Sequence, residues 1–306
     1  MPPAVVAPGP SVPEAGLRYP EVLRGRGPLV AVFGILLGVT SFMLLSTAVA
    51  QGLVFAGWRL GLTPGADFVS AYRAASSFET PWGMLAIHLG LAVLIPLSLA
   101  LVRVVHQARP AYLLSVRPGF RWGYLAASAG VALVVLNVVL AASTGFAIGE
   151  LRPQADFAVF LVVIVLTSPL QAAAEEFFFR GYLLQAFGSM TRTPWFGIVA
   201  SAALFALFHG TQNVPLFLDR FGFGLLAAVL VTRTGGLEAA IGAHVVNNVL
   251  AFAYAGLVST IAEVKAVQQV GWIDLAWDLA GFAVYTLAAI WLARRWGLQT
   301  LTAGSV

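Results

Sequence analysis

Residues 157–188 read FAVFLVVIVLTSPLQAAAEEFFFRGYLLQAFG, and this stretch decides the fold class. It is long enough to cross a bilayer, because about 20 apolar residues rising 1.5 Å each span the hydrocarbon core. Yet it places two adjacent glutamates and an arginine, Glu175, Glu176 and Arg180, among three phenylalanines. Ionisable side chains are costly in a membrane helix, so the stretch predicts a spanning helix that carries a functional site.

The rest of the chain has the same apolar character. Of its 306 residues, 59% are hydrophobic and only 10% are charged, whereas about a quarter of the residues of a soluble domain are charged. We therefore predict an all-α, polytopic integral membrane protein. About eight membrane helices are expected, over residues 28–55, 82–106, 122–148, 157–188, 195–209, 214–233, 237–256 and 273–294. Two of them are short or polar, 195–209 and 237–256, and are expected to be surrounded by protein rather than lipid.

Charge and cysteine content exclude several kinds of partner and chemistry. The net charge is +4, but the arginines are scattered at helix ends, which indicates membrane topology and contact with the lipid bilayer rather than nucleic-acid binding. Cysteine is absent, which excludes disulfides, thiolate metal sites and a cysteine nucleophile. Lys265 is the single lysine beside sixteen arginines, a composition that suggests a GC-rich bacterial genome.

The distribution of basic residues predicts the orientation. With the N-terminus in the cytoplasm, three arginines and the single lysine fall outside and eleven arginines fall inside, namely Arg18, Arg24, Arg26, Arg103, Arg109, Arg117, Arg121, Arg192, Arg233, Arg294 and Arg295. Cytoplasmic loops carry the excess of basic residues in membrane proteins. We therefore expect a multi-pass protein of the cell (inner or plasma) membrane with both termini in the cytoplasm.

The polar residues of the helix at 157–188 have separable roles. Glu176 and Arg180 are four residues apart, so they are expected to pair on one face of the helix as a structural ion pair. Glu175 lies about 100° around the helix from Glu176, so both glutamates cannot share Arg180 equally. A buried carboxylate that faces the interior suits the role of general base, and we assign that role to Glu175.

Two later helices supply the remaining candidates. FALFHG at 205–210 ends a helix with His209, and HVVNN at 244–248 places His244 and Asn248 on the same face. An imidazole beside an amide gives two donors aimed at one point, which suits an oxyanion. With Glu175 and His209 holding a water, the set predicts a peptide hydrolase.

The other intramembrane polar residues are interpreted as structural. His88 and His106 are expected to be packing residues, and Asp219 and Arg220 to compensate each other's charge locally. Glu238 begins a predicted helix, where a carboxylate complements the helix dipole.

Three motifs together resemble a known family. EEFFFR at 175–180 matches E-E-x-x-x-R, FALFH at 205–209 matches F-x-x-x-H, and HVVNN at 244–248 matches H-x-x-x-N. In order and spacing they resemble the CPBP family of intramembrane proteases, which includes the CAAX prenyl endopeptidases and the bacterial Abi proteins. The run TRTGGLEAAIGAH at 232–244 also resembles the family's sequence before its third motif. The resemblance covers about residues 155–256.

The resemblance implies an α-helical membrane endopeptidase whose catalytic cavity opens toward the cytoplasm. It implies that Glu175 and His209 activate the water, that His244 and Asn248 hold the oxyanion, and that Glu176 and Arg180 support the site. The predicted topology conflicts with a cytoplasmic cavity, because it ends the helix at 195–209 toward the outside.

The domain organisation follows from these features. We expect four regions: a flexible cytoplasmic N-terminal tail over 1–27, N-terminal transmembrane helices over 28–150, a CPBP/Abi-like protease core over 151–256, and a C-terminal transmembrane helix with a short tail over 257–306. The tail is expected to be flexible because it is rich in proline.

Zinc and the substrate stay open at this stage. One glutamate and two histidines could ligate zinc, and the family is often called metalloprotease. However, the chain has no H-E-x-x-H helix, and zinc would occupy the base and the oxyanion donors, so we favour hydrolysis without a cofactor. The expected partner is a peptide or small membrane-protein substrate, such as a bacteriocin precursor or a regulatory protein.

Two other classes of function compete with the protease. A non-catalytic bacteriocin-immunity or scaffold membrane protein would keep the fold, but the intact motifs argue against it. A proton-coupled transporter would use buried ionisable residues as a relay. That class typically shows inverted repeats or paired broken helices, which the sequence lacks.

Overall fold

The computed structural model describes residues 11–145 and 149–303, and these residues form a bundle of helices. Seven helical segments are long and apolar enough to cross a membrane. They are α1 (Pro28–Arg59), α3 with α4 (Pro81–Ala92 and Leu94–Val104), α5 (Trp122–Ser143), α6 continuing through a π-helix into α7 (Phe157–Glu175, Glu176–Leu183 and Leu184–Ser189), α9 (Val214–Thr234), α10 (Glu238–Val258) and α12 (Trp272–Arg295). The predicted all-α, multi-pass membrane fold is confirmed.

The remaining helices are too short to span. They are α2 (Phe68–Ser76), α8 (Pro194–Leu207), α11 (Ile261–Lys265) and three 3₁₀ turns at Tyr19–Glu21, Arg24–Arg26 and Pro110–Leu113. At 1.5 Å per residue, the 14 residues of α8 extend about 21 Å, less than the ~30 Å hydrocarbon core. α8 packs against α7 and α9, so protein surrounds much of this short helix, as expected for 195–209.

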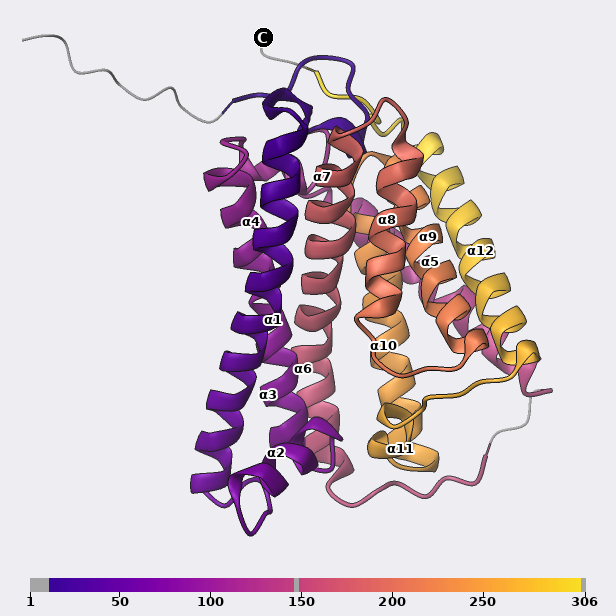
Figure 1. Ribbon diagram of the computed structural model, residues 1–306. Coiled ribbons are helices and arrows are strands. Elements are labelled where there is room, and N and C mark those ends of the chain that lie inside the picture. The colour runs from indigo at the N-terminus through magenta and orange to yellow at the C-terminus, as the bar shows by residue number, and fades with distance from the viewer. Residues whose placement is uncertain (1–10, 146–148, 304–306) are drawn as a thin grey trace, which may run out of the picture.

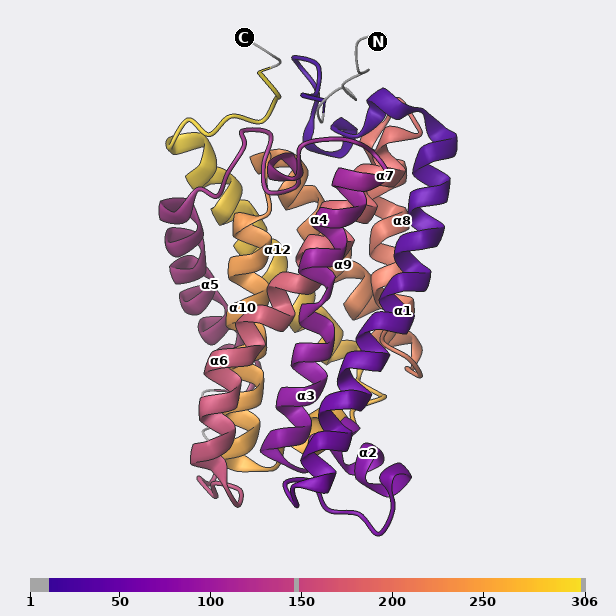
Figure 2. The same ribbon diagram turned by 90° about the vertical axis from the view of Figure 1, so that its left-hand side faces the viewer.

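The two ends of the bundle differ in what they carry. Figure 1 shows the C-terminus and the N-terminal segment at one end, and α2 and α11 at the other. We call these the terminal end and the α2–α11 end. Between them, α10 packs against α5, α6 and α9, and Figure 2 shows α6 and α10 running side by side. The helices that carry the first and third motifs are therefore adjacent in space.

Lipid contact explains the exposed surface of the outer helices. Leu36 on α1, Val134 on α5 and Leu287 on α12 are each more than 60% exposed, and many other large apolar side chains accompany them. In water such a surface would be an aggregation hazard, whereas in a bilayer it is the face that meets the acyl chains.

The segment before α1 is packed against the bundle. Tyr19 is fully buried, and its hydroxyl donates to a backbone carbonyl in the connection between α4 and α5. The backbone N–H of Gly16 donates to the carbonyl of Thr302, 2.9 Å away. Proline content predicted a flexible tail over 1–27, but residues 11–27 are held by these long-range contacts. The rest of the predicted tail lies outside the described residues.

A buried ion pair joins the starts of α5 and α10. Glu238, the first residue of α10 as predicted, is fully buried, and Arg121 donates from Nε to its Oε1 at 2.8 Å. Arg121 also donates from Nη1 to the carbonyl of Thr234 at 2.9 Å. This cluster holds the start of α5 against the start of α10, at the terminal end of the bundle.

Replacing Glu238 tests the contribution of this pair. Glu238→Ala leaves the Arg121 guanidinium without its buried partner, and we expect the free energy of unfolding to fall by about 3 kcal/mol. The measurement is reversible unfolding in mixed detergent micelles. The control is Glu150→Ala, because Glu150 pairs with Arg152 on the exposed surface, where such a pair is worth at most about 1 kcal/mol. Equal losses in the two variants would contradict the structural role.

Candidate active site

The first motif lies where the helix changes its winding. α6 ends at Glu175, and residues Glu176–Leu183 form a π-helix before α7 begins. A π-helical turn holds more residues than an α-helical turn and is frequent at functional sites. The local geometry therefore departs from the regular α-helix predicted for these glutamates.

The charge of Arg180 is matched by one carboxylate and two aromatic rings. The side chain is fully buried, and its Nη1 lies 3.1 Å from Oε1 of Glu176, the pair predicted from their spacing. Its guanidinium carbon lies 3.9 Å from the ring centroid of Phe205 on α8 and 5.2 Å from that of Phe223 on α9. The carboxylate and the ring faces take the place of water around the cation. Phe205, the aromatic residue of the second motif, thus contacts the guanidinium group of Arg180.

His244 lies between the two glutamates. Its Nδ1 is 2.7 Å from Oε1 of Glu176, and its Nε2 is 3.5 Å from Oε2 of Glu175. Because an ionised carboxylate only accepts, Nδ1 carries a proton that it donates to Glu176. The bond fixes the ring so that Nε2 points toward Glu175.

Gln171 completes the link between α6 and α10. Its Nε2 donates to Oε1 of Glu175 at 2.6 Å, and its Oε1 accepts from Nδ2 of Asn248 at 2.9 Å. None of the three sequence motifs includes this residue. The available signal was its position four residues before Glu175, which places both side chains on one face of α6.

His209 follows the end of α8. Its Nδ1 lies 2.7 Å from the carbonyl of Phe205, so Nδ1 carries the proton and Nε2 keeps its lone pair.

Arg220 donates from Nη1 to Oε1 of Gln212 at 2.8 Å. No ion pair joins Arg220 to Asp219 in the described part of the chain. The charge compensation predicted for these two residues therefore involves no ion pair between their side chains.

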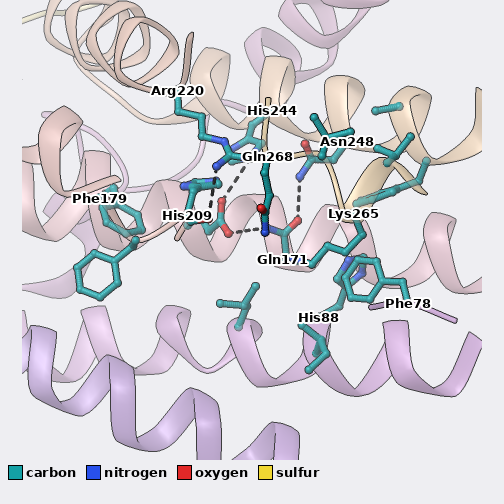
Figure 3. A pocket seen from close by; sticks show the side chains of 18 of the residues that line it. Phe78, His88, Gln171, Phe179, His209, Arg220, His244, Asn248, Lys265 and Gln268 are labelled. Atoms are coloured by element: carbon teal, nitrogen blue, oxygen red, sulfur yellow. Dashed lines mark hydrogen bonds and ion pairs between the residues drawn. The ribbon is translucent and has the colours of Figure 1, made fainter. Parts of the chain in front are cut away.

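One cavity of about 580 Å³ brings the predicted residues together. Glu175, His209, His244 and Asn248 all line it, whereas Glu176 and Arg180 lie behind its wall, fully buried. Figure 3 shows His209, His244 and the Gln171–Asn248 link near the centre of the pocket, and Lys265, His88 and Phe78 at the lower right. Polar side chains from α6, α10 and the α8–α9 connection thus meet around a shared space.

The two histidines interpreted as structural both have hydrogen-bond partners. His88 lines the cavity, but its Nδ1 lies 2.8 Å from the hydroxyl of Thr167 on α6. His106 lies at the end of α4, with its Nε2 3.2 Å from the hydroxyl of Tyr182. Each imidazole links two helices.

In the described part of the chain, the carboxylates and imidazoles are not gathered as a zinc site would require. Zinc in a catalytic site takes three protein ligands at about 2.0–2.2 Å. Over residues 11–145 and 149–303, no group of three His, Cys, Asp or Glu side chains is arranged to hold a metal ion. Nδ1 of His244 is bonded to Glu176 and Nδ1 of His209 to the carbonyl of Phe205, so Nε2 is the nitrogen that each ring has left for a ligand or a water.

Comparison with known proteins gives a match over the part of the chain that contains the three motifs. Residues 156–250 match the family model of the type II CAAX prenyl endopeptidase Rce1-like proteins. The uncharacterized protein YyaK of Bacillus subtilis (strain 168) is 35% identical over 94 residues, which are 29% of this chain and 31% of that relative. The match thus spans about a third of the relative's length. No solved structure matches.

The matched range contains all three motifs from which the resemblance was predicted, at 175–180, 205–209 and 244–248. The resemblance is therefore confirmed: this part of the chain matches the Rce1-like CAAX prenyl endopeptidases, within the CPBP proteases.

Proposed function

We propose that the protein is an intramembrane endopeptidase that hydrolyses a peptide bond in this cavity. The observation that carries the proposal is the convergence of Glu175, His209, His244 and Asn248 on one cavity within the membrane-spanning bundle. The match to an endopeptidase family supports the same reaction class. The substrate class is a peptide or a small membrane protein.

Glu175 is the proposed general base. One of its oxygens accepts from Gln171, and the other faces His244, so the carboxylate is held in a fixed orientation. A water between Glu175 and Nε2 of His209 would donate one hydrogen bond to each acceptor. Removal of a proton by Glu175 lets the water oxygen attack the carbonyl carbon of the substrate.

His244 and Asn248 are the proposed oxyanion donors. The Asn248 amide has two N–H groups, and the bond to Gln171 uses one, so the second is available to a substrate oxygen. This role requires a proton on both ring nitrogens, so His244 acts as an imidazolium that donates from Nε2 to the oxyanion while its Nδ1 still donates to Glu176. Glu176 and Arg180 act by positioning this ring. Donors fixed before the reaction stabilise the negative charge that develops in the transition state.

The proton balance closes on the same groups. Attack converts the substrate carbonyl to a tetrahedral oxyanion and transfers one proton to Glu175. Glu175 then returns this proton to the nitrogen of the leaving amine as the carbon–nitrogen bond breaks. The products are a new carboxyl end and a new amine end. No metal takes part in any of these steps.

Replacing the base tests the catalytic assignment. Glu175→Gln keeps the size of the side chain but removes the proton acceptor, and we expect kcat to fall by about 10²–10⁴-fold. The measurement is cleavage of a peptide library by the protein in proteoliposomes. The control is Glu150→Gln at the exposed surface, which should keep full activity. Unchanged cleavage of every responsive peptide by Glu175→Gln would refute the assignment.

Replacing the amide tests the oxyanion site. Asn248→Leu has a similar volume but no N–H donor, so we expect kcat to fall by about 10²–10³-fold with little change in KM. Steady-state kinetics on the same peptides separate the two constants. A rise in KM alone would show that Asn248 binds the ground state of the substrate instead.

Metal dependence is tested by elemental analysis together with chelation. We expect the active protein to contain less than stoichiometric zinc and to keep its activity after treatment with a chelator. One equivalent of zinc, with activity lost on chelation and restored by zinc, would overturn the metal-free mechanism.

A further inference from the structure

The cavity reaches the surface at the α2–α11 end. Its rim is formed by Thr211 in the α8–α9 connection and by Lys265 and Gln268 around α11, all three exposed. The two rim segments are joined by Asn213, whose backbone N–H donates to the carbonyl of Gln268 at 2.9 Å and whose Nδ2 donates to that of Val270 at 2.9 Å. Figure 1 shows α11 far from the chain termini.

The opposite side of the cavity is closed. Beyond Glu176 toward the terminal end lie Arg180, Leu183 and Gln185, each with no exposed surface. The Gln185 amide donates to the carbonyl of Tyr112 at 3.0 Å, which seals this layer against the α4–α5 connection. A substrate therefore reaches Glu175 from the α2–α11 end.

The rim lies where two spanning helices begin. α9 starts at Val214 and α12 at Trp272, directly after the two rim segments. Their 21 and 24 residues extend about 32 and 36 Å, close to the thickness of a hydrocarbon core. Trp272 is exposed at this level, as is typical of side chains at a membrane–water interface. The rim is thus placed at a membrane surface rather than at the bilayer centre.

Charge separates the two ends of the molecule. The terminal end carries eleven arginines and three acidic residues, Glu14, Glu21 and Glu238. The α2–α11 end carries three arginines and one lysine, and six acidic residues, Asp67, Glu79, Glu150, Asp156, Glu263 and Asp274. The excess of basic residues marks the cytoplasmic side of a membrane protein.

We infer that the cavity opens on the extracytoplasmic side of the membrane, and that the peptide segment it cleaves lies there. The part that concerns cleavage rests on the proposed endopeptidase function. The orientation rests only on the fold and the charges. The resemblance implied a cytoplasmic opening and the sequence predicted cytoplasmic termini, but the cavity and the termini lie at opposite ends, so the two expectations exclude each other.

The absence of cysteine from the chain makes this inference directly testable. Gln268→Cys places one thiol on the rim, and Ala303→Cys places one at the terminal end; both residues are exposed, so neither change leaves a cavity. Each variant is treated with a membrane-impermeant maleimide in intact bacterial cells and after permeabilisation. We expect Gln268→Cys to be labelled in intact cells without further gain on permeabilisation, and Ala303→Cys to be labelled only after it.

The reverse labelling pattern would overturn the inference. Labelling needs no catalysis, so adding Glu175→Gln to each variant should leave the pattern unchanged, and a failure of the proposed enzyme cannot be mistaken for a failure of the orientation. For the substrate, a peptide cleaved in proteoliposomes is fused to a single-span reporter on one or the other side of the membrane. Cleavage of the extracytoplasmic fusion is expected, and cleavage of the cytoplasmic fusion alone would refute the substrate assignment.

Discussion

The arrangement of the motif-bearing helices depends on the burial of one guanidinium group. Arg180 has no access to water, so its charge must be matched inside the bundle. Glu176 supplies the counter-charge, while Phe205 of α8 and Phe223 of α9 supply aromatic faces. Through Glu176 the cluster extends to His244 of α10. A single buried cation thus fixes the relative positions of four helical segments.

Adjacent glutamates divide this cluster into a dry side and a side that meets the cavity. Glu176 is fully buried between Arg180 and His244, whereas Glu175 lines the cavity with Gln171 beside it. Because the two carboxylates meet different surroundings, one can support the structure while the other is available for chemistry. His244 contacts both carboxylates. The bond from its Nδ1 to Glu176 orients the ring, and its Nε2 then faces Glu175 beside the cavity.

The two ends of the bundle complete this asymmetry. At the terminal end, the packed segment 11–27 and the Arg121–Glu238 pair cover the helix starts. At the α2–α11 end, the short α8 and the polar connections around Thr211 and Gln268 leave the cavity accessible. A helix of 14 residues cannot reach this end, and its early termination creates the space in which His209 lies.

The sequence by itself determined what depends on local periodicity. Apolar length gave the spanning helices, and the spacing of four residues paired Glu176 with Arg180 and put His244 and Asn248 on one wall of the cavity. The family motifs added the expected site residues. The catalytic roles of these residues and the domain boundaries of the chain stay predictions.

Only the tertiary structure decided the contacts between distant segments. These include the bond from His244 to Glu176, the Gln171 bridge to Asn248, and the packing of residues 11–27. It also decided at which end the cavity opens. Periodicity specifies which side chains share a face of a helix, but the partner of that face is set by how helices of unequal length pack together, and the sequence pattern of one helix does not contain that information.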